Sequence, residues 1–339
     1  MRPMLRAACA LLAASLGTTA AIAAPAPSLP APPAAGPQQR VTVDALSVVK
    51  LRSRAVADAR SAETLGTHRE GTGVVIDASG LVLTIGYLIL ESETVELSTA
   101  DGRSFPGTVV GYDAASGFGL VRAIGGLPIK PIQVGDSSTL AVREPVLIVG
   151  FDGVAPAYVV SRRRFVGYWE YLLEDAIYTA PATVNWQGAA LLDRERRLVG
   201  IGSLAVPDSV GPGSSVPGHM FVPIDRLKPV LADLIARGRP AGPPRPWLGV
   251  STHEVEGNVI VTRVATESPA DLAPIRIGDV IVALGGQTIR GQADFYTRLW
   301  GSGAAGGEIV IDVLRDGRIQ SVTVKPIDRD RYYRAKPTY

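Results

Sequence analysis

Residues Gly71–Thr84 read GTGVVIDASGLVLT, and this stretch decides the class of fold. Two apolar runs, Val74–Ile76 and Leu81–Leu83, flank Asp77–Gly80, which consists of residues that favour turns. Short apolar runs on both sides of such a turn predict a β-hairpin. The chain is therefore expected to reverse here within a few residues, as it does in all-β proteins.

Strand signals recur at short spacing after this hairpin. Val95 and Leu97 alternate with Glu96 and Ser98, a pattern typical of a half-buried strand. Charged residues make up only 19% of the chain, and Gly and Pro are numerous (37 and 26), which favours a turn-rich β protein. Further apolar runs predict buried strands at Val109–Val110, Val146–Val149 and Leu198–Ile201.

One helix is predicted near the middle of the chain, and a linker follows it. An apolar stripe at helical spacing begins at Leu227 and ends at Ile235, and Gly238 is a natural stop. Residues 239–245 are rich in Pro and Gly and predict a domain boundary. The stripe consists of Leu227, Val230, Leu231, Leu234 and Ile235.

A compact module of about 85 residues is predicted after the linker. Its last hairpin joins Ile309–Leu314 to Ile319–Val324 through a turn at Asp316–Gly317. A helical pattern covers Ala293–Trp300. The tail, residues 328–339, is charged and aromatic without clear periodicity.

The first residues have the organisation of a secretory signal. Arg2 and Arg6 precede the apolar stretch Ala7–Leu16, and Ala21–Ala23 forms an A-x-A cleavage site. Residues 1–23 are therefore expected to be removed on export, with residues 24–40 as a Pro- and Ala-rich tether. An uncleaved membrane anchor is the alternative.

Processing would change both charge and chemistry. The full chain has 34 Lys and Arg against 32 Asp and Glu, and removal of Arg2 and Arg6 balances the two. This balance argues against a nucleic-acid partner. Because Cys9 is the only cysteine and lies inside the predicted signal, the mature chain would have no disulfide and no thiol nucleophile. No metal-binding or cofactor-binding spacing is present, so no cofactor is expected.

Several motifs, in this order, resemble the HtrA/Deg family of trypsin-like serine proteases over residues 70–326. Each motif alone is weak, but their order and spacing together are specific. They are Gly71–Asp77, Ala100–Arg103, Val134–Ser137, Leu198–Ile201 and Phe221–Ile224, followed by Trp247–Val250, Ser268–Ala270 and Ile277–Ile281, which look like a PDZ domain.

The resemblance implies a mostly β fold: a trypsin-like double six-stranded β-barrel followed by a PDZ domain. The expected domains are the barrels over residues 41–238, the linker over 239–245, the PDZ domain over 246–327 and the tail over 328–339. A family-type trimer is in doubt, because such trimers use N-terminal aromatic residues and residues 1–86 contain none.

The family also implies a catalytic triad of Ser, His and Asp, and all three positions are substituted here. Tyr87 stands at the histidine position, within Thr84–Ile89. Gly117 stands at the aspartate position, and Asp113 is expected to be a turn residue. Gln187 stands at the serine position. Because a triad needs a nucleophile, a proton acceptor and an orienting carboxylate, these residues predict the absence of enzymatic activity.

The loop before Gln187 is altered as well. Asn185 replaces a glycine whose backbone would approach the substrate, and the bulky Trp186 follows it. Trp186 is expected either to fill the empty cleft or to lie on the surface. The chain's histidines, His68, His219 and His253, are interpreted as ordinary surface or strand-end residues, with no nucleophile placed near them by the family fold.

The PDZ module keeps its binding features better. By resemblance, Trp247, Leu248, Gly249 and Val250 form the loop whose N–H groups hold a peptide's terminal carboxylate. The helix Ala293–Trp300 would form the other wall of the groove. The candidate pocket residues on that helix are Phe295, Tyr296, Leu299 and Trp300, for which core packing is the alternative.

The sequence thus predicts an exported, periplasmic pseudoprotease that binds peptides or protein C-termini through its PDZ domain, as an adaptor, sensor or chaperone-like regulator. An active HtrA-like protease is a further candidate partner, and no membrane span is expected after signal cleavage. Two alternatives stay open: an active HtrA-type serine endopeptidase with a rearranged catalytic site, and a structural assembly protein.

Overall fold

The computed structural model describes residues 46–303 and 305–333. The predicted signal and tether, residues 1–40, and the end of the predicted tail lie outside the described residues.

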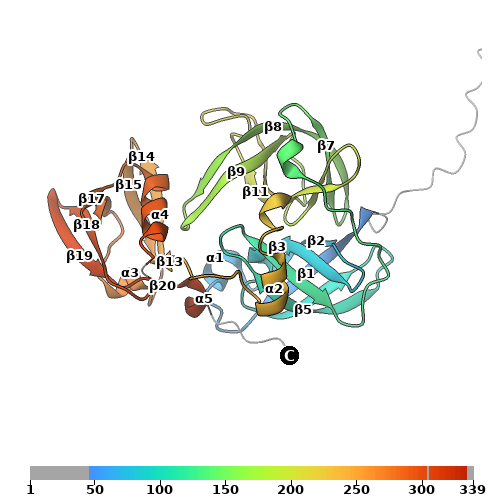
Figure 1. The fold of residues 1–339 in the computed structure, drawn as a ribbon, viewed down its shortest axis with the longest axis horizontal. Coiled ribbons are helices and arrows are strands. Elements are labelled where there is room, and N and C mark those ends of the chain that lie inside the picture. Colours follow the sequence, from blue (N-terminus) through green and yellow to red (C-terminus); the bar gives the residue numbers. More distant parts are fainter. Residues whose placement is uncertain (1–45, 304, 334–339) are drawn as a thin grey trace, which may run out of the picture. The chain divides into compact units, whose positions relative to one another are not determined.

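Six strands close into a first barrel (Figure 1). The hairpin predicted from Gly71–Thr84 is confirmed: Val74 pairs with Leu83, and the Asp77 carboxylate accepts hydrogen bonds from the N–H groups of Ser79 and Leu81. In order around the barrel the strands are β1 (Val48–Ala55), β2 (His68–Val75), β3 (Leu81–Ile85), β6 (Phe118–Ala123), β5 (Ser104–Tyr112) and β4 (Ser92–Ser98). The short helices α1 (Ala62–Leu65) and η2 (Gly86–Leu88) flank them.

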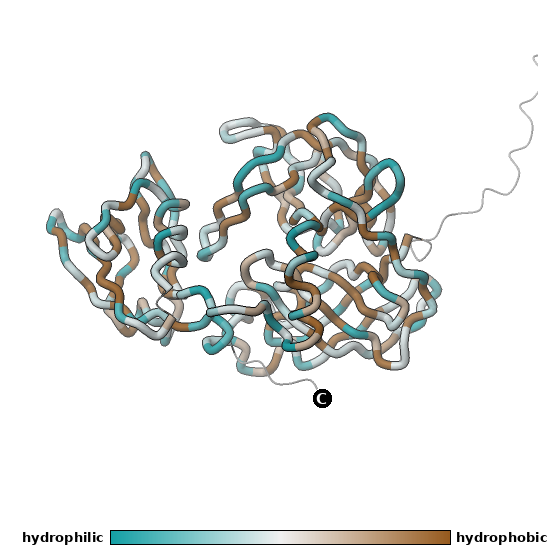
Figure 2. Tube along the Cα trace, in the orientation of Figure 1, coloured by the Kyte–Doolittle hydropathy of each residue, from teal (hydrophilic) through white to brown (hydrophobic). Residues whose placement is uncertain are grey.

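Six further strands close into a second barrel. In order they are β10 (Ala190–Leu192), β11 (Leu198–Val206), β12 (Gly218–Pro223), β9 (Tyr171–Ala180), β8 (Gly153–Gly167) and β7 (Pro145–Gly150). The predicted double six-stranded barrel is therefore confirmed. Apolar residues recur along these strands, while many turns are polar (Figure 2). The barrels bury their apolar side chains in large clusters that include Leu83, Phe118, Leu192 and Met220.

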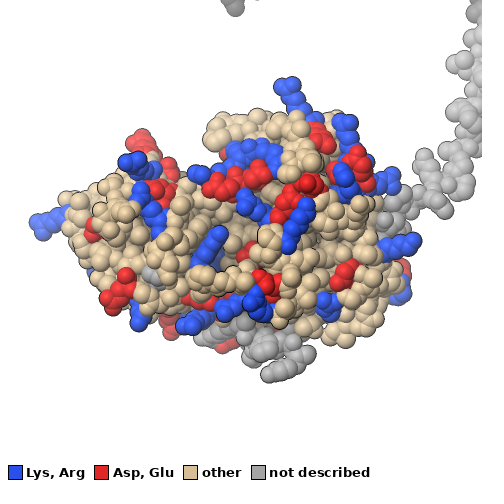
Figure 3. All heavy atoms as spheres, viewed as in Figure 1, with Lys and Arg blue, Asp and Glu red and all other residues tan. Residues whose placement is uncertain are grey.

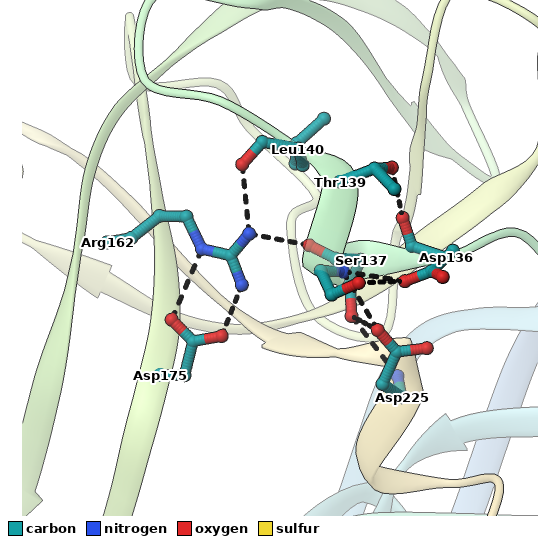
Figure 4. Close-up of polar contacts among 8 residues, drawn as sticks. Asp136, Ser137, Thr139, Leu140, Arg162, Asp175 and Asp225 are labelled. Atoms are coloured by element: carbon teal, nitrogen blue, oxygen red, sulfur yellow. Dashed lines mark hydrogen bonds and ion pairs between the residues drawn. The ribbon is translucent and has the colours of Figure 1, made fainter.

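A polar cluster joins the two short helices that follow family-like motifs, η3 (Ser137–Thr139) and η4 (Ile224–Arg226) (Figure 4). The Ser137 hydroxyl donates to the Asp225 carboxylate over 2.7 Å, and the Arg162 guanidinium reaches the Leu140 carbonyl over 2.9 Å. Arg162 also pairs with Asp175. Burial alone would raise the pKa of Asp225, but Lys228 and Ser137 lower it to about 2. These contacts give the motif residue Ser137 a structural role, because they hold η3 against η4.

The helix before the linker is shorter than predicted. α2 spans Leu231–Arg237, and its first turn is preceded by turns through Leu227–Val230. Pro229 has no N–H, which is compatible with a turn but not with the interior of a helix. Gly238 ends α2 with φ +75°, as predicted. Leu227 and Leu234 are buried, whereas Ile235 is largely exposed, so the apolar stripe is only partly used.

The C-terminal module is an antiparallel sheet with two helices. In order across the sheet, its strands are β14 (Val250–Val255), β15 (Asn258–Val264), β16 (Val280–Leu284), β18 (Ile309–Arg315) and β19 (Arg318–Val324). The short strand β17 (Gln287–Thr288) pairs with β16. The helices are α3 (Pro269–Leu272) and α4 (Gln292–Gly301), and the latter confirms the predicted helix. β13 (Pro246–Trp247) pairs with β20 (Ile327–Asp328), after which comes α5 (Arg329–Tyr332).

Basic and acidic side chains are interspersed on the face shown in Figure 3, in keeping with the balanced charge of the sequence. Among the described residues, no helix has the length and apolar character needed to cross a membrane.

Candidate functional site

The loop before β14 has the conformation expected of a carboxylate receptor. Gly249 has φ +86°, and a Cβ there would lie 2.3 Å from the Ser268 Cβ, so only glycine fits without a shift of the backbone. β14 is the edge strand of its sheet. An edge strand beside a helix is the arrangement by which a groove accepts an extended peptide.

The N–H groups of this loop already hold a carboxylate, that of Glu170 from the β8–β9 turn. The N–H groups of Gly249 and Val250 donate to its Oε1 over 2.8 and 3.1 Å, and the Leu248 N–H donates to Oε2 over 3.1 Å. Three convergent N–H donors form an anion-binding concavity. The loop is therefore built to bind a carboxylate.

The environment of this carboxylate is largely closed to water. Burial raises the pKa of Glu170 to about 7, although the three N–H groups and the nearby Arg329 act to lower it. Tyr296, whose own pKa burial raises to about 12, contacts the same residue: the Glu170 N–H donates to the Tyr296 hydroxyl over 3.2 Å.

The structure brings only some of the predicted groove residues together. Leu248, Gly249 and Val250 meet at the carboxylate, and the Tyr296 hydroxyl lies in the same network. Phe295 and Leu299 are instead fully buried in the core of the module.

The two predicted tryptophans lie elsewhere. The Trp300 ring stacks on Tyr296 at 5.5 Å, with the guanidinium of Arg245 over its own face. Trp247 packs against Tyr332.

Sequence reasoning missed Glu170, Thr252 and Gln292. The Gln292 amide donates to the Thr252 carbonyl over 2.9 Å and to the Tyr296 hydroxyl over 3.0 Å, which joins both residues to this network. Glu170 is separated from the loop by 78 to 80 positions. A single glutamate in a turn carries no sequence signal for such a contact. Gln292 could have been suspected, since it opens the helix that the family places beside the groove.

The three predicted triad positions lie where the two barrels meet. The Tyr87 hydroxyl donates to the Ser203 carbonyl over 2.8 Å, and burial raises the pKa of Tyr87. Gly117 has φ +86°, and its carbonyl accepts from the Gly86 N–H over 2.7 Å. The Gln187 carbonyl accepts from the Thr72 N–H over 2.8 Å. Their assignment to the triad stays a prediction.

The loop before Gln187 is held by side chains from several elements. Asn185 has φ +51° and bonds to Asp152. The Trp186 ring stacks on His219 at 5.7 Å. His219 is the second residue of β12, so its interpretation as a strand-end residue is confirmed, but at 1% exposure it is not a surface residue. Its Nε2 accepts a hydrogen bond from the Thr183 N–H over 2.7 Å.

Burial lowers the pKa of His219, and its Nε2 accepts the Thr183 N–H. The two remaining histidines are exposed, as predicted: His68 begins β2 and His253 lies on β14.

Asp113 is the turn residue that was predicted. Its carboxylate accepts from the N–H groups of Ala115 and Ser116 over 3.0 and 3.1 Å, and from the Ser116 hydroxyl over 2.6 Å. The carbonyl of Ser116 accepts a hydrogen bond from the Tyr171 hydroxyl over 2.7 Å.

These domains correspond to known protein families. Residues 71–201 match the trypsin-like peptidase domain, and residues 246–325 match the PDZ domain. The protein is thus of the class in which a trypsin-like peptidase domain precedes a PDZ domain.

Individual relatives confirm the resemblance to HtrA/Deg proteins. The HhoA protein of Synechocystis sp., which carries a serine protease name, is 28% identical over 290 residues, which cover 76% of this chain and 70% of HhoA. The periplasmic serine endoprotease DegP of Salmonella typhimurium is 25% identical over 75% of this chain and 56% of its own length. The chain thus spans little more than half of DegP.

Solved structures show the same fold. The HtrA-type protease AlgW with a decapeptide aligns over 86% of this chain and 97% of its own, with a TM-score of 0.51 and 21% identity. The serine endoprotease of Yersinia pestis aligns over 84% of this chain and 94% of its own, with a TM-score of 0.51 and 20% identity.

These names correct one expectation. The prediction that the chain is not an enzyme is contradicted, because the relatives are named serine proteases or endoproteases and the similar structures are HtrA-type proteases. The comparisons point to a proteolytic enzyme.

Proposed function

We propose that this chain is an HtrA-type protein whose PDZ domain binds the C-termini of peptides or proteins. The observation that supports the proposal is the convergence of the Leu248, Gly249 and Val250 N–H groups on one carboxylate. A free peptide C-terminus presents the same chemical group. The adjoining edge of β14 offers backbone groups that can pair with the peptide.

Titration of the full chain with fluorescein-labelled decapeptides that end in Val, Leu, Ile or Phe tests this proposal. We expect micromolar affinity, about −8 kcal/mol, because a flexible peptide loses conformational freedom on binding. Amidation of the terminal carboxylate should weaken the best peptide at least tenfold. Equal binding of the acid and the amide would remove the carboxylate loop from the proposal.

A second function, cleavage of peptide bonds, is favoured by the names of the relatives. The proposed triad positions carry a phenol, a hydrogen atom and a carboxamide, so the nucleophile of such a reaction would lie elsewhere. Incubation with unfolded casein measures the activity, and a fluorophosphonate probe followed by peptide mapping identifies a reactive serine. Casein that stays intact over a long incubation would count against this function.

The place of action that we propose is the periplasm. The signal-like organisation of residues 1–23 and the periplasmic DegP relative support it. Sequencing the N-terminus of the exported protein should find a start close to Ala24. Recovery of the full-length chain in the membrane fraction would favour the anchor instead.

A further inference from the structure

The turn between β8 and β9 is a short loop with an unusual residue at its end. Gly167 pairs with Tyr171, which leaves Tyr168, Trp169 and Glu170 as a three-residue turn. Such turns usually close with a residue in the left-handed region, where glycine is preferred. Glu170 occupies that region with φ +56°. A glutamate in this conformation costs backbone energy that a glycine would not.

The backbone of this turn makes one hydrogen bond to the edge of β14. The Thr252 N–H donates to the Tyr168 carbonyl over 2.9 Å. Two residues further along the chain, the Glu170 carboxylate sits in the loop of N–H groups. The turn therefore combines a pairing with the edge strand and a carboxylate in the receptor loop, the two contacts expected of a C-terminal ligand.

The other wall of the groove also holds the turn. The Tyr296 hydroxyl, from α4, donates to the Gly167 carbonyl over 3.0 Å. The Gln292 amide, also from α4, lies 3.3 Å from the same carbonyl and 2.9 Å from the Thr252 carbonyl. Val166 and Leu172, on either side of the turn, pack against the apolar core of the module. Both walls thus contact the same short segment.

We propose that the turn Gly167–Tyr171 is a built-in ligand of the PDZ groove, and that a peptide C-terminus binds this groove only after displacing it. The inference rests on the proposed function and adds a regulatory step to it. Each backbone N–H is a single donor, so the three donors that hold Glu170 cannot hold a second carboxylate at the same time. The internal ligand and an external peptide therefore compete.

Competition lowers the apparent affinity by the fraction of molecules whose groove is open. Because the internal ligand is part of the same chain, it competes at a constant, high effective concentration. Ligands of moderate affinity would be excluded, and only a peptide with further contacts to β14 and α4 would bind.

Three variants of the full chain distinguish the loss of the built-in ligand from unfolding of the protein. Glu170→Gly removes the carboxylate while placing the residue preferred at φ +56° in the turn, so the hairpin itself keeps its conformation. Glu170→Gln keeps the shape of the side chain and removes its charge. Glu174→Gln makes the same change four residues later, on the adjoining strand β9, at an exposed residue paired with Arg164, and is the matched control.

Titration with the decapeptides ending in Val, Leu, Ile or Phe is the first measurement. We expect Glu170→Gly to bind the best peptide at least tenfold more tightly than the unaltered chain, Glu170→Gln to change in the same direction, and Glu174→Gln to stay within twofold. Equal affinities of all four chains would overturn the built-in ligand and leave the proposed function intact. Failure of every chain to bind any peptide would contradict the proposed function and, with it, displacement.

Hydrogen exchange of the unaltered chain is the second measurement. A ligand ordinarily protects the amides near its site, whereas here saturating peptide should speed the exchange of residues 166–172 while it protects β14. Glu170→Gly without peptide should show the same faster exchange. Protection of the turn that persists in saturating peptide would overturn the proposal.

Discussion

The substitution Gly249→Ala tests whether the carboxylate loop depends on glycine for the reasons seen in the structure. Two costs add at this position. Alanine at φ +86° pays roughly 1–2 kcal/mol for the left-handed conformation. The new Cβ would also lie 2.3 Å from the Ser268 Cβ and 2.9 Å from the Trp247 ring, and relief of such overpacking typically costs about 1–3 kcal/mol.

Gly257→Ala is the matched control for this substitution. Gly257 lies in the turn between β14 and β15 with φ +79°, and a Cβ there would meet no atom within 4 Å. Gly257→Ala therefore has only the conformational cost of the left-handed backbone. The free energy of unfolding of the PDZ domain should fall by about 2–5 kcal/mol for Gly249→Ala and by about 1–2 kcal/mol for the control.

The assay is native-state hydrogen exchange followed in peptides from β15 and β18, because a chain of several domains need not unfold in one step. The difference between the two variants isolates the steric cost. Equal losses of stability would show that the loop can move away from Ser268 without cost, and would refute the argument that only glycine fits.

Two further predictions concern a buried ion pair and the contact between the barrels. Asp279→Asn should destabilise the PDZ domain by about 3 kcal/mol or more, because it leaves Arg315 without the carboxylate that it contacts at 2.6 and 2.7 Å. Hydrogen exchange in β16 and β18 measures this loss of stability. Unchanged exchange would show that the pair behaves like an exposed ion pair. Tyr87→Phe should lower the free energy of unfolding of the barrels by about 1 kcal/mol through loss of the bond to the Ser203 carbonyl, measured by urea denaturation, and an unchanged midpoint would show that this bond is replaced by water.

The sequence by itself determined the fold through patterns that are local. The turn Asp77–Gly80 between two apolar runs, the turn Asp316–Gly317 and the helical pattern of Ala293–Trp300 all appear in the structure where they were predicted. Such features depend on neighbours within a few residues, so they can be recognised before any tertiary contact is known. The N–H loop at Trp247–Val250 was expected instead from the resemblance of this short motif to the family's PDZ domain.

Tertiary structure alone decided how buried residues are used. His219 lies at the start of its strand, as predicted, but only the structure shows that it is buried, stacked on Trp186 and bonded to Thr183. Pocket and core were both open for Phe295 and Leu299, and the structure buries both in the core of the module, because the sequence shows which residues share a helix face but not which face the sheet covers.

The contact of Glu170 with Gly249 is the clearest case of what the sequence left undetermined. The two residues are 79 positions apart, and Glu170 adopts a backbone conformation in which a glycine would have been expected. No local pattern marks a turn that reaches another domain, since the contact depends on the path of the whole chain between β9 and β14. The sequence predicted a site that binds carboxylates, and only the tertiary structure showed that the protein's own Glu170 carboxylate occupies it.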